Sequence, residues 1–203
     1  MASLAEVPGR IESLFNVKVV NSAGIYSVNF YVNGQRKEVI IDDYVPCDPK
    51  NKMPSFAYSA DMGEIWAMLL EKAWAKLHGS YCMIRKGSTI SAMPHLTGAA
   101  SSTIDHNFIN DIDIFWTRLN DAVERKYAVT CSTQETDLPS LSRRHGIISG
   151  HSYSILATHR FKHKSAKVRL VKLRNPQGTN EWQGDWSDKS DKWTPKIRAD
   201  LGA

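Results

Sequence analysis

The chain has 203 residues, 42% of them hydrophobic, and a formal net charge of +5. This length allows one large domain or two small lobes with a sizeable core, and the hydrophobic content is that of an ordinary globular protein. The sequence contains no apolar run long enough for a membrane span and no recognisable secretory signal, so it predicts no membrane span.

The chain is predicted to begin with a short helix followed by a β-hairpin. The helix places four apolar side chains on one side: Leu4, Ile11, Leu14 and Phe15. Residues 25–32 and 37–41 are predicted to be strands because they flank Asn33 and Gly34. Asn-Gly between two apolar runs is a strong signal for a tight hairpin turn.

A long helix and a hinge are predicted next. Four apolar residues recur there at helical spacing: Ile65, Leu69, Ala73 and Leu77. They predict a helix from Gly63 to His78, which Gly79 ends. The small, polar stretch 98–102 is the expected hinge, so we expect one domain over 1–100 and a second over 101–203.

The second half is predicted to be rich in strands. One helix is expected near 109–126, although its first residues, 111–116, alternate polar and apolar and could begin as a strand. An apolar strand is expected at 127–130. Two further strands, 152–157 and 168–173, are joined by a basic turn and should pair as an antiparallel hairpin.

This last hairpin predicts that His151 and Asn175 lie together. In an antiparallel pair the start of one strand lies beside the end of its partner. An Asn oxygen that accepts from one imidazole nitrogen leaves the other nitrogen free as a base, which is the orienting half of a nucleophile–His–Asn triad. The alternative is a surface histidine at a strand end next to an Asn-Pro turn.

The residues around this pair resemble those of the calpain family. Residues 146–154 resemble its histidine motif and 174–188 its asparagine motif, and three further blocks match in family order: 3–15, 40–43 and 64–81. The resemblance covers nearly the whole chain. It implies an α+β, papain-like cysteine protease with a helical lobe followed by a β-rich lobe, an active site in the cleft between them, and His151 and Asn175 as catalytic residues.

The nucleophile of that family is missing from the chain. Calpains carry it in a Gly-x-Cys-Trp element whose place would fall before Met1, so we expect the chain alone to be inactive. The chain has three other cysteines: Cys47, Cys82 and Cys131. The N-terminus of a helix would lower the pKa of a thiol, but none of the three stands at the start of a predicted helix. Each is therefore expected to be inert. An odd number of cysteines without a signal peptide favours a cytoplasmic location.

The resemblance also implies a possible calcium site in the second lobe. Glu181 and Asp188 match two positions that help to bind calcium there, but two carboxylates do not complete a shell, so only weak binding is expected. A first-lobe site is doubtful because residues 87–92 contain no carboxylate. Gln177 replaces the family's Trp after Asn-Pro, which should admit water to the His–Asn bond.

Three functions are considered on this basis. The first is a calpain-type, calcium-dependent cysteine endopeptidase core that acts on proteins or peptides. The alternative is a non-catalytic calpain-like module that binds protein or calcium. The third function is nucleic-acid binding, which the basic residues at 143–145 and 159–169 suggest. Alternating Lys and Arg usually form a solvated face, however, so we expect no nucleic-acid binding. Substrate specificity, the oligomeric state and whether Met1 is the true start are left open.

Overall fold

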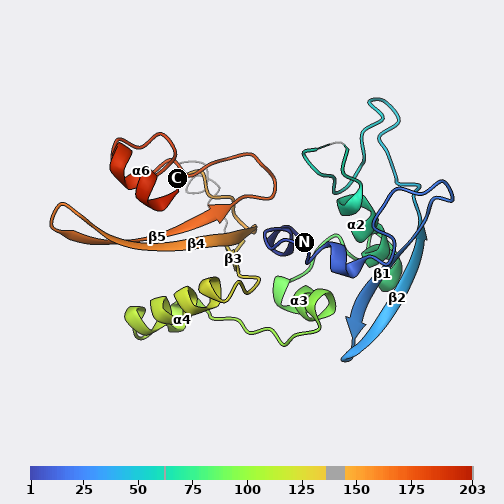
Figure 1. Cartoon of the computed structure of the whole chain (residues 1–203), viewed down its shortest axis with the longest axis horizontal. Helices are drawn as coiled ribbons and strands as arrows, with labels where there is room; N and C mark the ends of the chain where they lie inside the picture. The colour runs from blue at the N-terminus through green and yellow to red at the C-terminus, as the bar shows by residue number, and fades with distance from the viewer. Residues whose placement is uncertain (62, 136–144, 203) are drawn as a thin grey trace. The chain divides into compact units, whose positions relative to one another are not determined.

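The computed structural model describes residues 1–61, 63–135 and 145–202 (Figure 1). It divides into two compact units, one formed by Met1 and Ser3–Phe108, the other by Ala2 and the chain from Ile109 onward. Both units mix helices with strands. The boundary between these units follows Phe108. The predicted division into two lobes at residue 100 stays a prediction.

The N-terminal segment forms two short helices instead of one. They are α1 (Ala2–Ala5) and the 3-10 helix η1 (Glu12–Leu14). Helix α1 ends at Ala5, and Gly9 lies between the two helices with a φ of +82°, in the left-handed region that glycine tolerates. The four apolar residues expected on one side are all buried, with 2–7% of their surface exposed: Leu4, Ile11, Leu14 and Phe15.

The predicted first hairpin is present. Strands β1 (Ile25–Val32) and β2 (Gln35–Asp42) pair antiparallel through a two-residue turn in which Asn33 and Gly34 both have positive φ. That is the turn geometry that suits the twist of a hairpin. The β1 side chain of Phe30 is completely buried, and its ring meets Trp74 edge-to-face at 5.5 Å.

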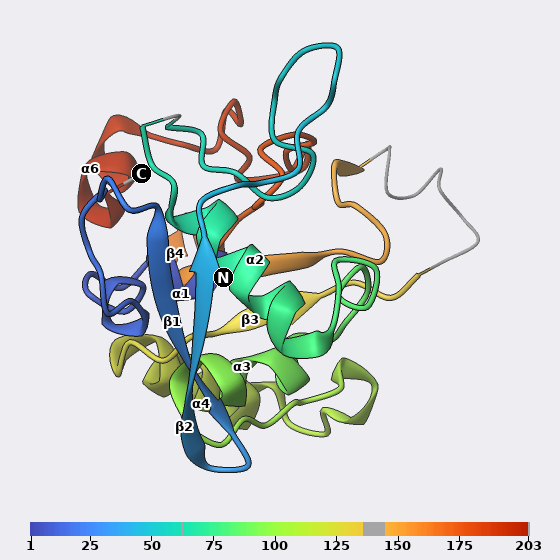
Figure 2. The same ribbon diagram turned by 90° about the vertical axis from the view of Figure 1, so that its right-hand side faces the viewer.

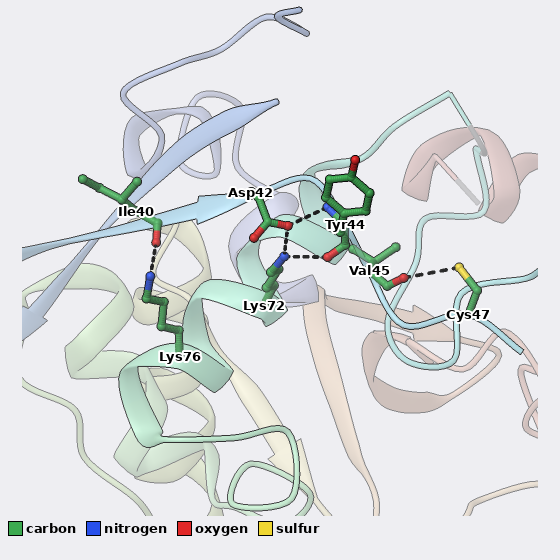
Figure 3. Close-up of polar contacts among 7 residues, drawn as sticks. All are labelled: Ile40, Asp42, Tyr44, Val45, Cys47, Lys72 and Lys76. Atoms are coloured by element: carbon green, nitrogen blue, oxygen red, sulfur yellow. Dashed lines mark hydrogen bonds and ion pairs between the residues drawn. The ribbon is translucent and has the colours of Figure 1, made fainter. Parts of the chain in front are cut away.

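Helix α2 (Trp66–His78) begins three residues later than predicted and ends at Gly79, as expected. Figure 2 shows α2 alongside the β1–β2 hairpin. Two of its lysines bind the end of β2 (Figure 3): the Lys72 ammonium donates to the Asp42 carboxylate and the Tyr44 carbonyl, both at 2.5 Å, and the Lys76 ammonium donates to the Ile40 carbonyl at 2.8 Å.

Two helices were not anticipated. Helix α3 (Thr89–Thr97) contains Pro94 and ends at Gly98, whose φ is +70°, so the first residue of the expected hinge is a helix cap. A single 3-10 turn, η2 (His106–Phe108), follows. The second unexpected α-helix, α6 (Pro195–Leu201), starts after Thr194, whose hydroxyl accepts from the Ile197 backbone N–H at 3.2 Å.

Helix α4 (Ile112–Glu124) corrects the idea that this region starts as a strand. The Asp111 carboxylate accepts from the backbone N–H groups of Asp113 and Ile114 at 2.7 and 3.0 Å, and so caps the helix. Trp116 is its buried residue, whereas Ile112 and Ile114 are 59% and 55% exposed. The polar–apolar alternation therefore came from a capping aspartate next to exposed isoleucines.

A three-stranded antiparallel sheet carries the second unit. Its strands, in spatial order, are β3 (Thr130–Ser132), β4 (Ser152–His163) and β5 (Ala166–Arg174). Cys131 therefore lies within β3 and not after it. A bulge interrupts the β4–β5 register between Ile155 and Ala157. Helix α4 packs on this sheet, with the Arg169 guanidinium 5.6 Å from the ring centroid of Trp116.

In the described part of the chain, none of the helices combines the length and the apolar character that crossing a bilayer requires.

Candidate active site

His151 and Asn175 meet at one end of the β4–β5 hairpin. His151 immediately precedes β4 and Asn175 immediately follows β5, so antiparallel pairing puts them side by side. The imidazole Nε2 lies 2.8 Å from the Asn175 Oδ1, and both residues are half-buried. The expected hydrogen bond is therefore confirmed.

This bond defines which imidazole nitrogen is available for chemistry. An amide oxygen can only accept, so the neutral His151 ring carries its proton on Nε2 and leaves Nδ1 with a lone pair. The Asn175 amide is held in turn: its Oδ1 also accepts from the Gln177 backbone N–H at 3.0 Å, and its Nδ2 donates to the Thr179 carbonyl. The arrangement suits a base whose acceptor nitrogen is Nδ1.

Thr133, just after β3, anchors the backbone of His151. Its backbone N–H donates to the His151 carbonyl at 2.9 Å, and its hydroxyl accepts from the His151 N–H at 3.1 Å. The same hydroxyl donates to the Ile148 carbonyl at 2.6 Å. One threonine therefore binds both backbone polar groups of His151 and ties them to the preceding loop.

Tyr153 holds the same loop from the other end. Its hydroxyl accepts from the Ile148 backbone N–H at 2.8 Å, and its ring meets the His151 ring edge-to-face, with centroids 4.9 Å apart. Ile148 is thus bound through its carbonyl by Thr133 and through its N–H by Tyr153. The imidazole is confined by packing as well as by its bond to Asn175.

Gly146 lets the loop before His151 lie against the loop after Asn175. A Cβ at this position would lie only 1.8 Å from the Glu181 carbonyl oxygen, and φ is +74°. Beside it, the Gln183 backbone N–H donates to the His145 carbonyl at 3.1 Å. No side chain fits between these two backbones, which explains why glycine is needed.

The tryptophans of the second loop differ in their packing. Trp186 meets three other rings edge-to-face: Phe161, His163 and Trp193. Trp182 is 42% exposed, stacks at 5.9 Å on His145 and donates from its indole N–H to the Asp185 carbonyl at 2.7 Å. Trp186 therefore packs among other rings around the turn, whereas Trp182 stays partly exposed.

Comparison with known proteins identifies the family of the chain. A model of the family described as "Calpain family cysteine protease" matches residues 1–202. The chain belongs to the calpain family. It is 36% identical to the calpain-type cysteine protease DEK1 of Arabidopsis thaliana over 99% of the chain, and 34% identical to calpain-9 of Homo sapiens over 84% of it.

These relatives are much longer proteins. The chain covers 9% of the Arabidopsis thaliana protein, 24% of human calpain-9 and 21% of calpain-A of Drosophila melanogaster, to which it is 36% identical. Family membership identifies a protease-type domain with mixed helix and strand, as the structure has. The roles of individual residues come from the geometry described above.

The three cysteines of this calpain-family chain lie in different environments. Cys47 and Cys82 are exposed, whereas Cys131 is half-buried, and its burial raises the pKa of the thiol. None of the described helices begins at a cysteine. Cys131 pairs with Tyr153 across the sheet, so it lies on the same face as the Tyr153 ring. Its raised thiol pKa does not fit an activated nucleophile, which needs a lowered pKa.

The acids expected to bind calcium are present but do not form a complete site. Glu181 and Asp188 are both exposed, and the described residues contain no group of three or more His, Cys, Asp or Glu side chains able to hold a metal ion. The Asp188 carbonyl accepts from the Arg198 guanidinium at 2.7 Å, and the neighbouring Asp185 forms an ion pair with Lys192. These donors do not fit a full calcium shell, and weak binding stays a prediction.

Proposed function

We propose that the chain supplies the His–Asn half of a calpain-type cysteine endopeptidase that cleaves proteins or peptides. The observation that carries this proposal is the 2.8 Å bond between His151 Nε2 and Asn175 Oδ1, which leaves Nδ1 as the base. Membership of the calpain family supplies the reaction class. A cytoplasmic location and calcium dependence belong to the same proposal.

The mechanism uses His151 twice. Its Nδ1 takes the proton of a cysteine thiol, giving a thiolate and an imidazolium that Asn175 orients through Nε2. The thiolate attacks the scissile carbonyl, the imidazolium returns its proton to the leaving amine, and water then hydrolyses the thioester with His151 again as base. The thiolate is contributed by a cysteine other than Cys47, Cys82 and Cys131.

The test restores a nucleophile. The chain is extended at its N-terminus with the cysteine-bearing segment of human calpain-9, and cleavage of a fluorogenic peptide is measured. We expect cleavage that a thiol alkylator and His151→Ala abolish and that Asn175→Ala lowers, while the control His106→Ala has no effect. The unextended chain should be inactive. Activity that survives His151→Ala would overturn the proposal.

The bond itself is tested without any nucleophile. Nitrogen NMR of the unextended chain should report a proton on His151 Nε2, and Asn175→Ala should redistribute it between the two nitrogens because the acceptor is gone. An unchanged tautomer in Asn175→Ala would remove Asn175 from its orienting role.

The second candidate is a non-catalytic calpain-like module that binds protein or calcium. It is favoured by the burial of Cys131, which raises the pKa of that thiol, and by the fact that none of the described helices begins at a cysteine. The extended chain distinguishes the two candidates, because a module of this kind would stay inactive although His151 and Asn175 keep their hydrogen bond.

A further inference from the structure

The turn end of the β4–β5 hairpin concentrates positive charge. Arg160 is paired directly opposite Arg169, and Lys162 directly opposite Lys167. Lys164 lies in the turn between the strands, with a φ of +53°. We call these five residues the basic tip. Like charges placed opposite each other destabilise an antiparallel pair, so this arrangement has no structural benefit for the hairpin.

The four strand residues of the basic tip share one face of the hairpin. Directly opposed residues point to the same side, and so do residues two apart along a strand. The intervening Phe161 and His163 point to the other side, where the Trp186 ring covers them. The loop after Asn175 therefore packs on the apolar face, and the basic face is the one on which helix α4 packs, with Trp116 next to Arg169.

One carboxylate in the described chain compensates this charge. Asp113 forms an ion pair with Arg169, and the hydrogen bond and charge of Arg169, with smaller contributions from Arg160 and Lys167, lower the pKa of the Asp113 carboxyl. Five cations less one anion leave a local charge of +4. Four of the five basic residues are exposed, Arg169 being the half-buried one.

The basic tip extends beyond the helix that covers the rest of this face. Asn120 of α4 bonds Thr158, and Asp113, at the start of α4, reaches Arg169, so the Lys162–Lys167 pair and the turn lie past the helix end. Figure 1 shows the hairpin projecting past α4. Ile112 and Ile114, on either side of Asp113, are more than half exposed.

We propose that the basic tip binds the anionic surface of a phospholipid bilayer. Clusters of four to eight Lys and Arg bind such surfaces, and exposed apolar side chains beside the cations add to this attraction. The exposed isoleucines favour a bilayer over an acidic polypeptide, which would need cations alone. Binding at this end of the hairpin is independent of the proposed peptidase activity.

The test is sedimentation of the full chain with vesicles. Phosphatidylcholine vesicles containing about one third phosphatidylserine are compared with pure phosphatidylcholine. We expect binding to the anionic vesicles only, weakening as salt rises. The variant Lys162→Gln/Lys164→Gln/Lys167→Gln should bind about 100-fold more weakly, because each lysine near a membrane surface contributes roughly fivefold. Circular dichroism checks that the variant is folded.

A matched control separates the basic tip from net charge. Lys18→Gln/Lys37→Gln/Lys50→Gln removes the same charge from exposed lysines of the first unit and should bind like the unmodified chain. An equal loss in both triple variants, equal binding to neutral vesicles, or no loss in the tip variant would overturn the proposal. Tighter, tip-dependent binding to poly-glutamate than to vesicles would overturn it in favour of an acidic polypeptide.

Discussion

Thr133 is the residue on which the position of His151 depends most directly. It makes four hydrogen bonds, three to the backbone N–H and carbonyl of His151 and one to the Ile148 carbonyl. Thr133 and His151 are 18 residues apart in the sequence, so no local pattern predicts their contact. A hydroxyl next to a strand end is too common in sequences to have singled it out.

Thr133→Val is expected to lower the free energy of unfolding by about 1–3 kcal/mol. The reason is that the part-buried backbone N–H of His151 loses the hydroxyl that accepts its hydrogen bond. Thr133→Ser keeps the hydroxyl and should cost clearly less. Urea unfolding of the three proteins measures both changes. The tautomer of His151 should become mixed in Thr133→Val only. Equal losses of stability in the valine and serine variants would show that the methyl group contributes as much as the hydroxyl, which would contradict this expectation.

Cys131 is expected to alkylate more slowly than Cys47 and Cys82. Its burial raises the pKa of the thiol and limits access of the reagent, so less thiolate of Cys131 is present and exposed at a given pH. Mass spectrometry after timed iodoacetamide treatment gives each rate, with urea-unfolded protein as control. Faster labelling of Cys131 near neutral pH would instead mark it as an activated thiol.

At the scale of elements, two loops and one strand pair bring the site together. The hairpin itself was predictable, because apolar alternation in both strands and an intervening basic turn define its ends at His151 and Asn175. The packing of the two loops was harder to predict from the sequence. The contact between Gly146 and the Glu181 carbonyl joins residues that the whole hairpin separates along the chain. Gly146 in the histidine motif was the available signal.

Gly146→Ala should destabilise the second unit strongly, by about 3 kcal/mol or more, because the new methyl group would overlap the Glu181 carbonyl oxygen and force the loops apart. The matched control is Gly178→Ala, which has a similar positive φ but nothing within 4 Å. It should cost about 1 kcal/mol, from backbone strain alone. Thermal unfolding of both proteins decides; equal losses would mean that φ, and not close packing, explains Gly146.

Glu71 of α2 links that helix to the loop before it. Its carboxylate accepts from the Ala57 backbone N–H at 2.8 Å, and burial raises the pKa of the carboxyl. A folded-state pKa above the unfolded value favours the protonated form, so this contribution to stability is present at low pH and is lost as pH rises through the folded pKa.

Glu71→Gln is therefore expected to raise the melting temperature near neutral pH and to change it little near pH 4, because the amide keeps an acceptor for Ala57 without a buried charge. Thermal unfolding from pH 4 to 8 measures the effect. The exposed Glu12→Gln is the control and should leave the pH profile as it is. A larger gain at pH 4 than at pH 7 would reverse the sign and contradict the argument.

For the whole molecule, the sequence was most informative where several blocks of residues agreed. The resemblance of five segments to calpains identified the family, and the hairpin gave the His–Asn contact. Local ambiguity limited the rest: Pro94 obscured α3, and the Asp-Ile alternation at the start of α4 imitated a strand because Asp111 caps that helix. The arginines at 143 and 144 in the expected basic cluster lie outside the described residues.

Calcium binding to the whole chain is expected to be weak, in the millimolar class, because Glu181 and Asp188 are exposed and lack further carboxylate partners in the described chain. Isothermal titration of Glu181→Gln/Asp188→Asn should show even less heat than the unmodified chain. Glu12→Gln/Asp43→Asn is the matched control and should change nothing. Micromolar binding that survives the first double substitution would exclude these two acids.

The length of the β4–β5 hairpin has a consequence for any membrane-bound state. His151 stands at one end of β4 and the basic tip at the other, and β4 has 12 residues. At about 3.3 Å per residue, this places the imidazole at most roughly 40 Å from a bilayer that holds the tip. The strand would then limit the reach of the site, so that scissile bonds on membrane-anchored proteins would be cleaved no further than about a dozen extended residues from the lipid.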